Sequence, residues 1–96
     1  MILPVGSVQF VGYNGPTITL ANAAWKNNVS AIYKPNVNNN GFRSFKPASG
    51  FNSLTTLEDG GHYQFSVTTS FELDGINSLH EAGFPEGVVI MDGEIL

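Results

Sequence analysis

Turn-forming dipeptides constrain this chain more than any other feature. Asn or Asp precedes Gly at positions 14, 40, 59, 74 and 92, so that successive pairs are 15 to 26 residues apart. Such a pair favours a tight turn, because Gly adopts positive φ without strain and the Asn or Asp side chain bonds its own backbone. Turns at this spacing are typical of a β-sandwich or small barrel. We therefore expect an all-β fold, a small sandwich or flattened barrel of about seven short strands.

The clearest strand pattern lies between residues 62 and 67, where polar and apolar residues alternate. Tyr63, Phe65 and Val67 fall on one predicted face, which we assign to the core. The Asn-Gly pair at 14 predicts that the segments on either side of it form a hairpin. The other expected strands are 8–13, 17–20, 29–33 and 42–46, a continuation of the central strand through 68–73, and a last hairpin of 88–91 with 94–96.

Two segments leave an α+β alternative open. Residues 21–28 contain Ala-Ala-Trp and can form a helical turn, and residues 76–82 can form a short helix that ends at Gly83. Both segments are short, so either helix would need packing against the sheet to be stable.

The length of 96 residues predicts one domain, 1–96. A domain of this size buries only about two-thirds of the surface of its unfolded chain. The chain has no Cys, which excludes disulfides, Cys-ligated metals and thiol catalysis. Because small domains without such cross-links often gain stability by oligomerisation, we expect association with other copies of the chain.

Charge is unevenly distributed along the chain. The net charge is −4; every basic residue lies between positions 26 and 46, and every acidic residue between 58 and 94. This pattern predicts a positive and a negative face that orient self-association, although chance placement explains it equally simply. Four basic residues are too few for a nucleic-acid interface. The candidate contact residues are Lys26, Lys34, Arg43 and Lys46, together with the apolar run Val88, Val89, Ile90 and Met91.

That apolar run is the longest in the chain, and it is far too short to span a bilayer, so we expect no membrane insertion. Its proposed role is a docking edge for another chain. The residues after Met1 have no basic and apolar pattern of a signal peptide. We therefore expect a product made in the cytoplasm of its host cell.

Residues that support catalysis are scarce. His62 and His80 are the only histidines, and neither recurs at metal-ligand spacing. No Ser lies in a nucleophile elbow, and no Gly-rich loop suggests a phosphate site. We expect no enzyme activity, no catalytic residue, no metal and no cofactor.

The aromatic residues admit two interpretations. They can line a glycan-binding platform, or they can form the hydrophobic core, which a small β domain needs in about this number. The core interpretation is favoured. The residues concerned are Trp25, Tyr33, Phe42, Phe45, Phe51, Tyr63, Phe65 and Phe71.

A motif spans residues 42 to 67. It reads aromatic-x-x-aromatic-x-Pro, then Asn-x-Leu-x-x-Leu-Glu-x-Gly before a Tyr that opens a strand. Its key positions are Phe42, Phe45, Pro47, Asn52, Leu54, Leu57, Gly60 and Tyr63. The segment resembles a module found in bacteriophage virion proteins and bacterial surface proteins. It departs from that module at His62, where a second Gly is usual, and at Phe42, where Trp is usual.

The resemblance implies a virion or a cell-surface setting, and the lack of a signal peptide favours the virion. In a virion setting, a small β domain without Cys is similar to head decoration and fibre proteins. The implied function is a non-enzymatic structural protein of a bacteriophage particle, a capsid decoration (cement) protein that stabilises neighbouring capsomers. Its partners would be copies of itself and a major capsid or fibre protein. The alternative is a receptor- or glycan-binding module of a phage fibre or bacterial surface protein.

Overall fold

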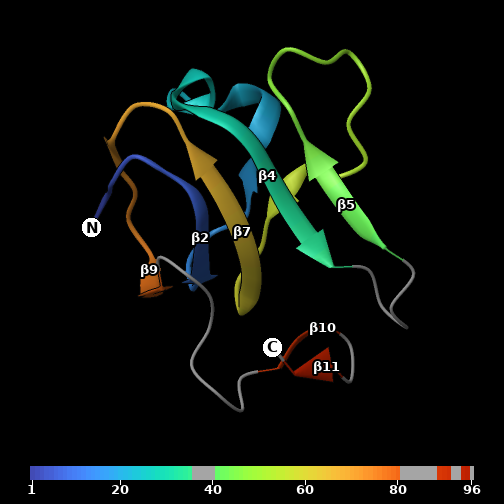
Figure 1. Cartoon of the computed structure of the whole chain (residues 1–96). Helices are drawn as coiled ribbons and strands as arrows, with labels where there is room; N and C mark the ends of the chain where they lie inside the picture. The colour runs from blue at the N-terminus through green and yellow to red at the C-terminus, as the bar shows by residue number, and fades with distance from the viewer. Residues whose placement is uncertain (36–40, 81–88, 92–93, 96) are drawn as a thin grey trace.

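The computed structural model describes residues 1–35, 41–80, 89–91 and 94–95. Its main element is an antiparallel sheet with the strand order β5-β4-β7-β2-β9 (Figure 1). The central strand β7 pairs with β4 on one side and β2 on the other. The strands are β2 (Gly6–Tyr13), β4 (Val29–Pro35), β5 (Phe42–Phe45), β7 (Gly61–Val67) and β9 (Ile76–His80).

Short segments complete the described part of the chain. Three strand pairs form small antiparallel sheets: β1 (Ile2–Leu3) with β8 (Phe71–Glu72), β3 (Ile18–Thr19) with β6 (Thr56–Leu57), and β10 (Val89–Met91) with β11 (Glu94–Ile95). The helical segments in the described ranges are two 3-10 turns, η1 (Leu20–Asn22) and η2 (Lys26–Asn28). The all-β prediction is confirmed. Among the described residues, no helical segment has the length and apolar character that crossing a membrane requires.

The hydrophobic core lies on one face of the five-stranded sheet. Tyr63, Phe65 and Val67 of β7 are buried, as the alternation predicts, whereas Gln64 and Ser66 between them are partly exposed. Each large apolar side chain removed from water in this way contributes roughly 1.5–3 kcal/mol. The sheet is therefore amphipathic, with one dry face and one face of mixed polarity.

A layer of short segments covers the apolar face. Leu20 of η1, Leu54, and Leu57 of β6 are buried in the same hydrophobic cluster. Trp25, which precedes η2, stacks on Phe71 with 4.9 Å between ring centroids and 15° between ring planes. The fold is a flattened sandwich in which this layer replaces a second large sheet.

The hairpin predicted around Asn14 is wrong. Residues 18–19 do form a strand, β3, but it pairs with β6 instead of β2. β2 has no free edge to offer, because β7 and β9 already occupy its two sides. Asn14 instead donates its backbone N–H to the carbonyl of Gly75, 2.7 Å away. Positive φ is found at Gly41, Gly60 and Gly75.

The short helix considered for residues 76–82 is also wrong, since residues 76–80 form the edge strand β9. The pairing with β2 shifts register between Gly12, opposite Ser78, and Tyr13, opposite Ile76. Asn77 is thus an extra residue, and such a bulge places Ile76 and Leu79 on the same side of the strand. Both side chains pack against the core. They are three residues apart, which is also the spacing of side chains on one face of a helix, so the bulged strand resembles a helix in sequence.

Two further expectations need correction. The segment 21–28 forms no α-helix, only parts of η1 and η2. The polar residues 68–70 do not extend β7. The backbone N–H groups of Thr68 and Thr69 both bond the carbonyl of Asn28, at 2.8 and 3.1 Å, and this turns the chain away from the sheet. Phe71 and Glu72 then pair with β1.

Gly60 and Gly75 make a matched test of the turns. Both have positive φ, +81° and +89°, but a Cβ on Gly60 meets no atom within 4 Å, whereas on Gly75 it meets the Asn14 carbonyl oxygen at 2.6 Å. We expect Gly60→Ala to lower the free energy of unfolding by about 1–2 kcal/mol, the cost of left-handed backbone. Gly75→Ala should lose clearly more, because the backbone clash adds to that cost. Urea unfolding followed by circular dichroism measures both, and equal losses would contradict the close packing at Gly75.

Candidate interaction surface

The face of the sheet opposite the core carries a row of side chains that crosses four strands. Tyr33 of β4 lies opposite Ser44 of β5 and Gln64 of β7, and Gln64 lies opposite Phe10 of β2. We call Ser44, Tyr33, Gln64 and Phe10 the outer row. All four are partly exposed. The surface is therefore neither a core nor a uniformly polar face.

Two aromatic rings on this face form a corner beside Gln64. The rings of Tyr33 and Phe42 are 6.4 Å apart between centroids and meet at 77°. Phe42 is 51% exposed although it begins a strand. Together with Gln64 these residues line a hollow of about 280 Å³. On the other side of Tyr33, the Lys46 Nζ lies 6.0 Å from its ring centroid.

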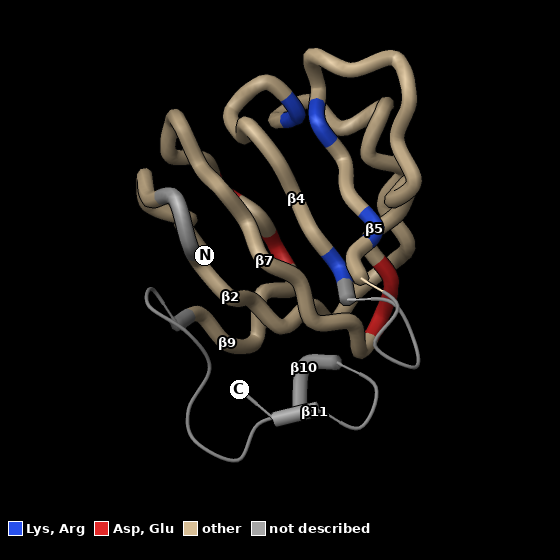
Figure 2. The backbone as a smooth tube through the Cα atoms, turned by 45° about the vertical axis from the view of Figure 1, so that its right-hand side comes forward, with Lys and Arg blue, Asp and Glu red and all other residues tan. Residues whose placement is uncertain are grey.

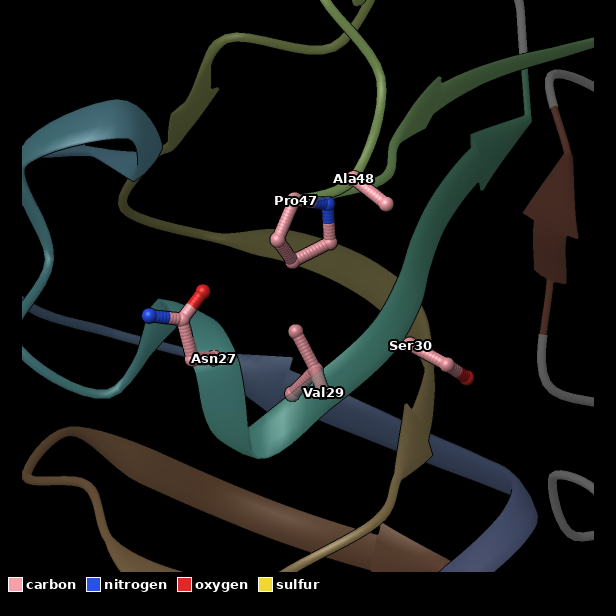
Figure 3. A pocket seen from close by; sticks show the side chains of 5 residues that line it. All are labelled: Asn27, Val29, Ser30, Pro47 and Ala48. Atoms are coloured by element: carbon pink, nitrogen blue, oxygen red, sulfur yellow. The ribbon is translucent and has the colours of Figure 1, made fainter.

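A second hollow of about 280 Å³ lies between the start of β4 and the loop after β5 (Figure 3). Pro47 and Ala48 face Asn27 and Val29 across it. Ser30 also lines it, but its hydroxyl points away from Pro47 and donates to the Ser66 hydroxyl, 2.7 Å away. The hollow thus offers a ligand few free polar groups.

A third hollow, of about 420 Å³, is bounded by Tyr13, Ile18 and the turn that contains Asp74. Burial raises the pKa of Tyr13, and the charges of Asp59 and Asp74 raise it further. The Tyr13 hydroxyl donates to the carbonyl of Pro16, so it is a structural donor. In the described part of the chain, no three His, Cys, Asp or Glu residues gather as a metal site would require.

The four basic residues line the β4–β5 ribbon as two pairs, one at each end (Figure 2). At one end Lys34 lies directly opposite Arg43 on the paired strands. Burial lowers the pKa of Lys34, and Arg43 lowers it further, whereas Glu58 acts in the opposite direction. The Lys34 Nζ lies 4.6 Å from the Tyr63 ring centroid, which offsets part of the desolvation by a cation–π contact.

The other pair lies at the opposite end of the ribbon, because Lys26 is in η2 just before β4 and Lys46 directly follows the antiparallel β5. Lys26 is partly tied down, because its Nζ donates to the carbonyl of Ala21 at 3.0 Å. The apolar run is less informative. Val88 lies outside the described residues, as do the side chains of Val89, Ile90 and Met91, whose backbone forms β10.

The 42–63 motif forms a packing unit around β5. Phe45, Leu54, Leu57 and Tyr63 are buried, and the Tyr63 hydroxyl accepts a hydrogen bond from the backbone N–H of Glu58 at 2.7 Å. Phe42 departs from this pattern, since it lies on the outer face. Pro47 and Asn52 are partly exposed, and Gly60 is exposed in its turn.

The loop of this motif covers the free edge of β5 at Ser44 and at Lys46, the residue after the strand. The Asn52 side-chain oxygen accepts the backbone N–H of Lys46 at 2.8 Å, and the Ser53 hydroxyl accepts that of Ser44 at 3.0 Å. Leu54 donates its own N–H to the Ser44 carbonyl at 2.9 Å. This protection of an edge strand was not predicted, although Asn and Ser shortly after a strand are the residues that supply it.

The aromatic residues divide between the two faces. The core interpretation is correct for Phe45, Tyr63, Phe65 and Phe71, and Trp25 packs against the same cluster. It fails for Phe42 and for Phe51, which is 95% exposed. Tyr33 lies on the face opposite Trp25, so one continuous platform that contains both is excluded.

His62 lies on the outer face, next to Tyr63, and the side chain of His80 lies outside the described residues. Burial lowers the pKa of His62, and the charge of Lys34 lowers it further. Its imidazole is therefore neutral in a larger share of molecules at neutral pH than a solvated histidine would be.

Comparison with protein-family models, with curated proteins and with solved structures finds no significant match to this chain.

The lowered pKa of His62 predicts a pH dependence of stability. A folded-state pKa below the unfolded value of about 6.5 means that the unfolded chain binds the proton more tightly. The free energy of unfolding should therefore fall as the pH drops through 6.5 toward the folded-state pKa. Urea unfolding of the wild type and of His62→Gln between pH 5 and 8 tests this. The variant should lose less stability over that range, and parallel curves would refute the assignment.

Proposed function

We propose that this chain is a non-enzymatic structural protein of a bacteriophage particle, a capsid decoration protein that stabilises neighbouring capsomers. The observation that carries the proposal is the arrangement of two basic pairs along a ribbon whose free edge is partly covered by its own loop. Because the backbone N–H and carbonyl of Ser44 are bonded to the loop, a partner at this part of the β5 edge meets side chains and not a free strand edge. That suits docking on an acidic protein surface.

The resemblance of residues 42–67 to a module of virion proteins supports the same proposal. In this chain the module packs a strand, a loop and a turn around Tyr63. A unit of this kind provides shape and rigidity. Its exposed parts are free to vary with the partner, which is what an attachment protein of a particle needs.

Charge and apolar surface have different roles in this proposal. Exposed ion pairs contribute only about 0–1 kcal/mol each, so the basic residues would set orientation. Affinity would come from apolar area, for which the segment from Val88 to Met91 is the candidate. In sequence, residues 81–96 contain four acidic residues and no basic residue, so this segment and the β4–β5 ribbon of another copy have complementary charge.

The alternative function, a receptor- or glycan-binding module, is favoured by one observation, the aromatic corner beside Gln64. It would use Tyr33 and Phe42. Trp25 would have no part in it, because its ring is stacked on Phe71.

Mass spectrometry of purified phage particles tests the decoration role. The chain should be present in stoichiometric amounts, with copies and a major capsid or fibre protein as its cross-linked neighbours. Its absence from the particles would refute the proposal.

Deletion and point variants test how the protein attaches. Deleting residues 88–96 should abolish assembly and leave the fold intact, since β10 pairs with β11 in a sheet separate from the five-stranded one. Arg43→Ala or Lys46→Ala should only weaken assembly and reduce its salt dependence. Sedimentation and circular dichroism measure both effects. A deletion variant that still assembles, or one that cannot fold, would contradict this account.

A further inference from the structure

We infer that the hollow lined by Tyr33, Phe42 and Gln64 is a binding site for one acidic sugar ring. The inference rests on the glycan-binding alternative proposed above and names its ligand, and it is independent of the proposed attachment to a capsid. It lies on the face of the sheet opposite the core, next to the outer row. The three residues that line the hollow are fixed by strand pairing.

The walls of the hollow come from rigid elements. Tyr33 and Gln64 are opposite one another on the paired strands β4 and β7. Phe42 lies two residues before Ser44, the partner of Tyr33 on β5, and so points to the same face. Three neighbouring strands thus hold one group each, and the site needs no loop closure.

The apolar part of the site is the aromatic corner. With its rings at 77°, the pair offers a ring face and a ring edge to the same ligand. Phe42 keeps half of its surface exposed, although burial would be favourable, so an apolar ligand face gains from covering it. A pyranose ring has such a face, formed by its axial C–H groups.

The polar part of the site is the Gln64 amide. Its side chain has no hydrogen-bond partner among the described residues, and neither does the Tyr33 hydroxyl. Together they offer donors and acceptors that match the hydroxyl groups around a sugar ring. A purely apolar ligand would leave these groups unpaired, which disfavours it.

The charge beside the hollow and its size restrict the range of ligands further. Lys46 directly follows the last residue of β5, and its Nζ lies 6.0 Å from the Tyr33 ring centroid. An anionic group on the ligand would reach this ammonium while the ring covers Tyr33. The volume of about 280 Å³ is just below the ~300–1,000 Å³ of sites for drug-sized molecules, so one ring fits.

The test is a titration of the full chain with glucuronic acid, and with glucose as the neutral match, followed by two-dimensional NMR. We expect shifts confined to Tyr33, Phe42, Gln64 and their neighbours, with a Kd of about 1 mM for a ligand of so few atoms. Glucose should bind at least threefold more weakly. Tyr33→Ala and Gln64→Ala should each weaken glucuronic acid binding tenfold or more.

Two further variants complete the test, one as a control and one for the charge of the site. Phe51→Ala removes a ring that is 95% exposed and lines no part of the hollow, and it should bind like the wild type. Lys46→Gln tests the charge of the site instead, and it should lower the affinity for glucuronic acid to that for glucose. If Tyr33→Ala fails to fold, Gln64→Ala decides the result.

Absence of shifts at these residues with either sugar would overturn the site, as would equal loss in Phe51→Ala. Equal affinity for the two sugars would overturn the assignment of an acidic ligand. Because the titration uses the free protein, its failure leaves the particle experiment unaffected, and the reverse also holds.

Discussion

The structure depends on one buried row of side chains that crosses four strands. Phe65, in the middle of β7, lies opposite Gln9 of β2 and Ile32 of β4, and Ile32 lies opposite Phe45 of β5. All four are buried. A slip of one residue in any pairing would turn an apolar side chain to the outer face, so this row fixes the register of the sheet. The outer row follows from it, because alternate residues must point the other way.

Much of the fold was predictable because its signals are local. The alternation from His62 to Val67 identified β7 and its buried face, and Asp59-Gly60 and Asp74-Gly75 identified real turns. The predictions that failed concern which segments pair as neighbouring strands. The Asn14 turn does not join neighbouring strands, and a bulge at Asn77 made β9 resemble a helix. Both errors involve β2, whose two partners come from distant parts of the chain and leave no mark in its own sequence.

The candidate site was predictable only in part. Lys34 and Arg43, which the sequence named only as candidate contact residues, are direct partners on β4 and β5. The corner of Tyr33 and Phe42 was not expected, because composition alone cannot divide the aromatic residues between the faces of a sheet. Because of that division, the two faces of the sheet carry aromatic residues with different roles. Trp25 and Phe71 stabilise the core, while Tyr33 and Phe42 remain available to a ligand.

Thiol labelling tests most directly which residues of β7 face the core and which face outward, because the chain has no Cys of its own. Single Cys variants would be made at Gln64 of the outer row, at exposed Phe51 and at buried Val67, and treated with a maleimide under native conditions. We expect Gln64→Cys to react at a rate close to that of Phe51→Cys, and Val67→Cys to react only on unfolding. Protection of Gln64→Cys to the level of Val67→Cys would contradict the register and the site built on it.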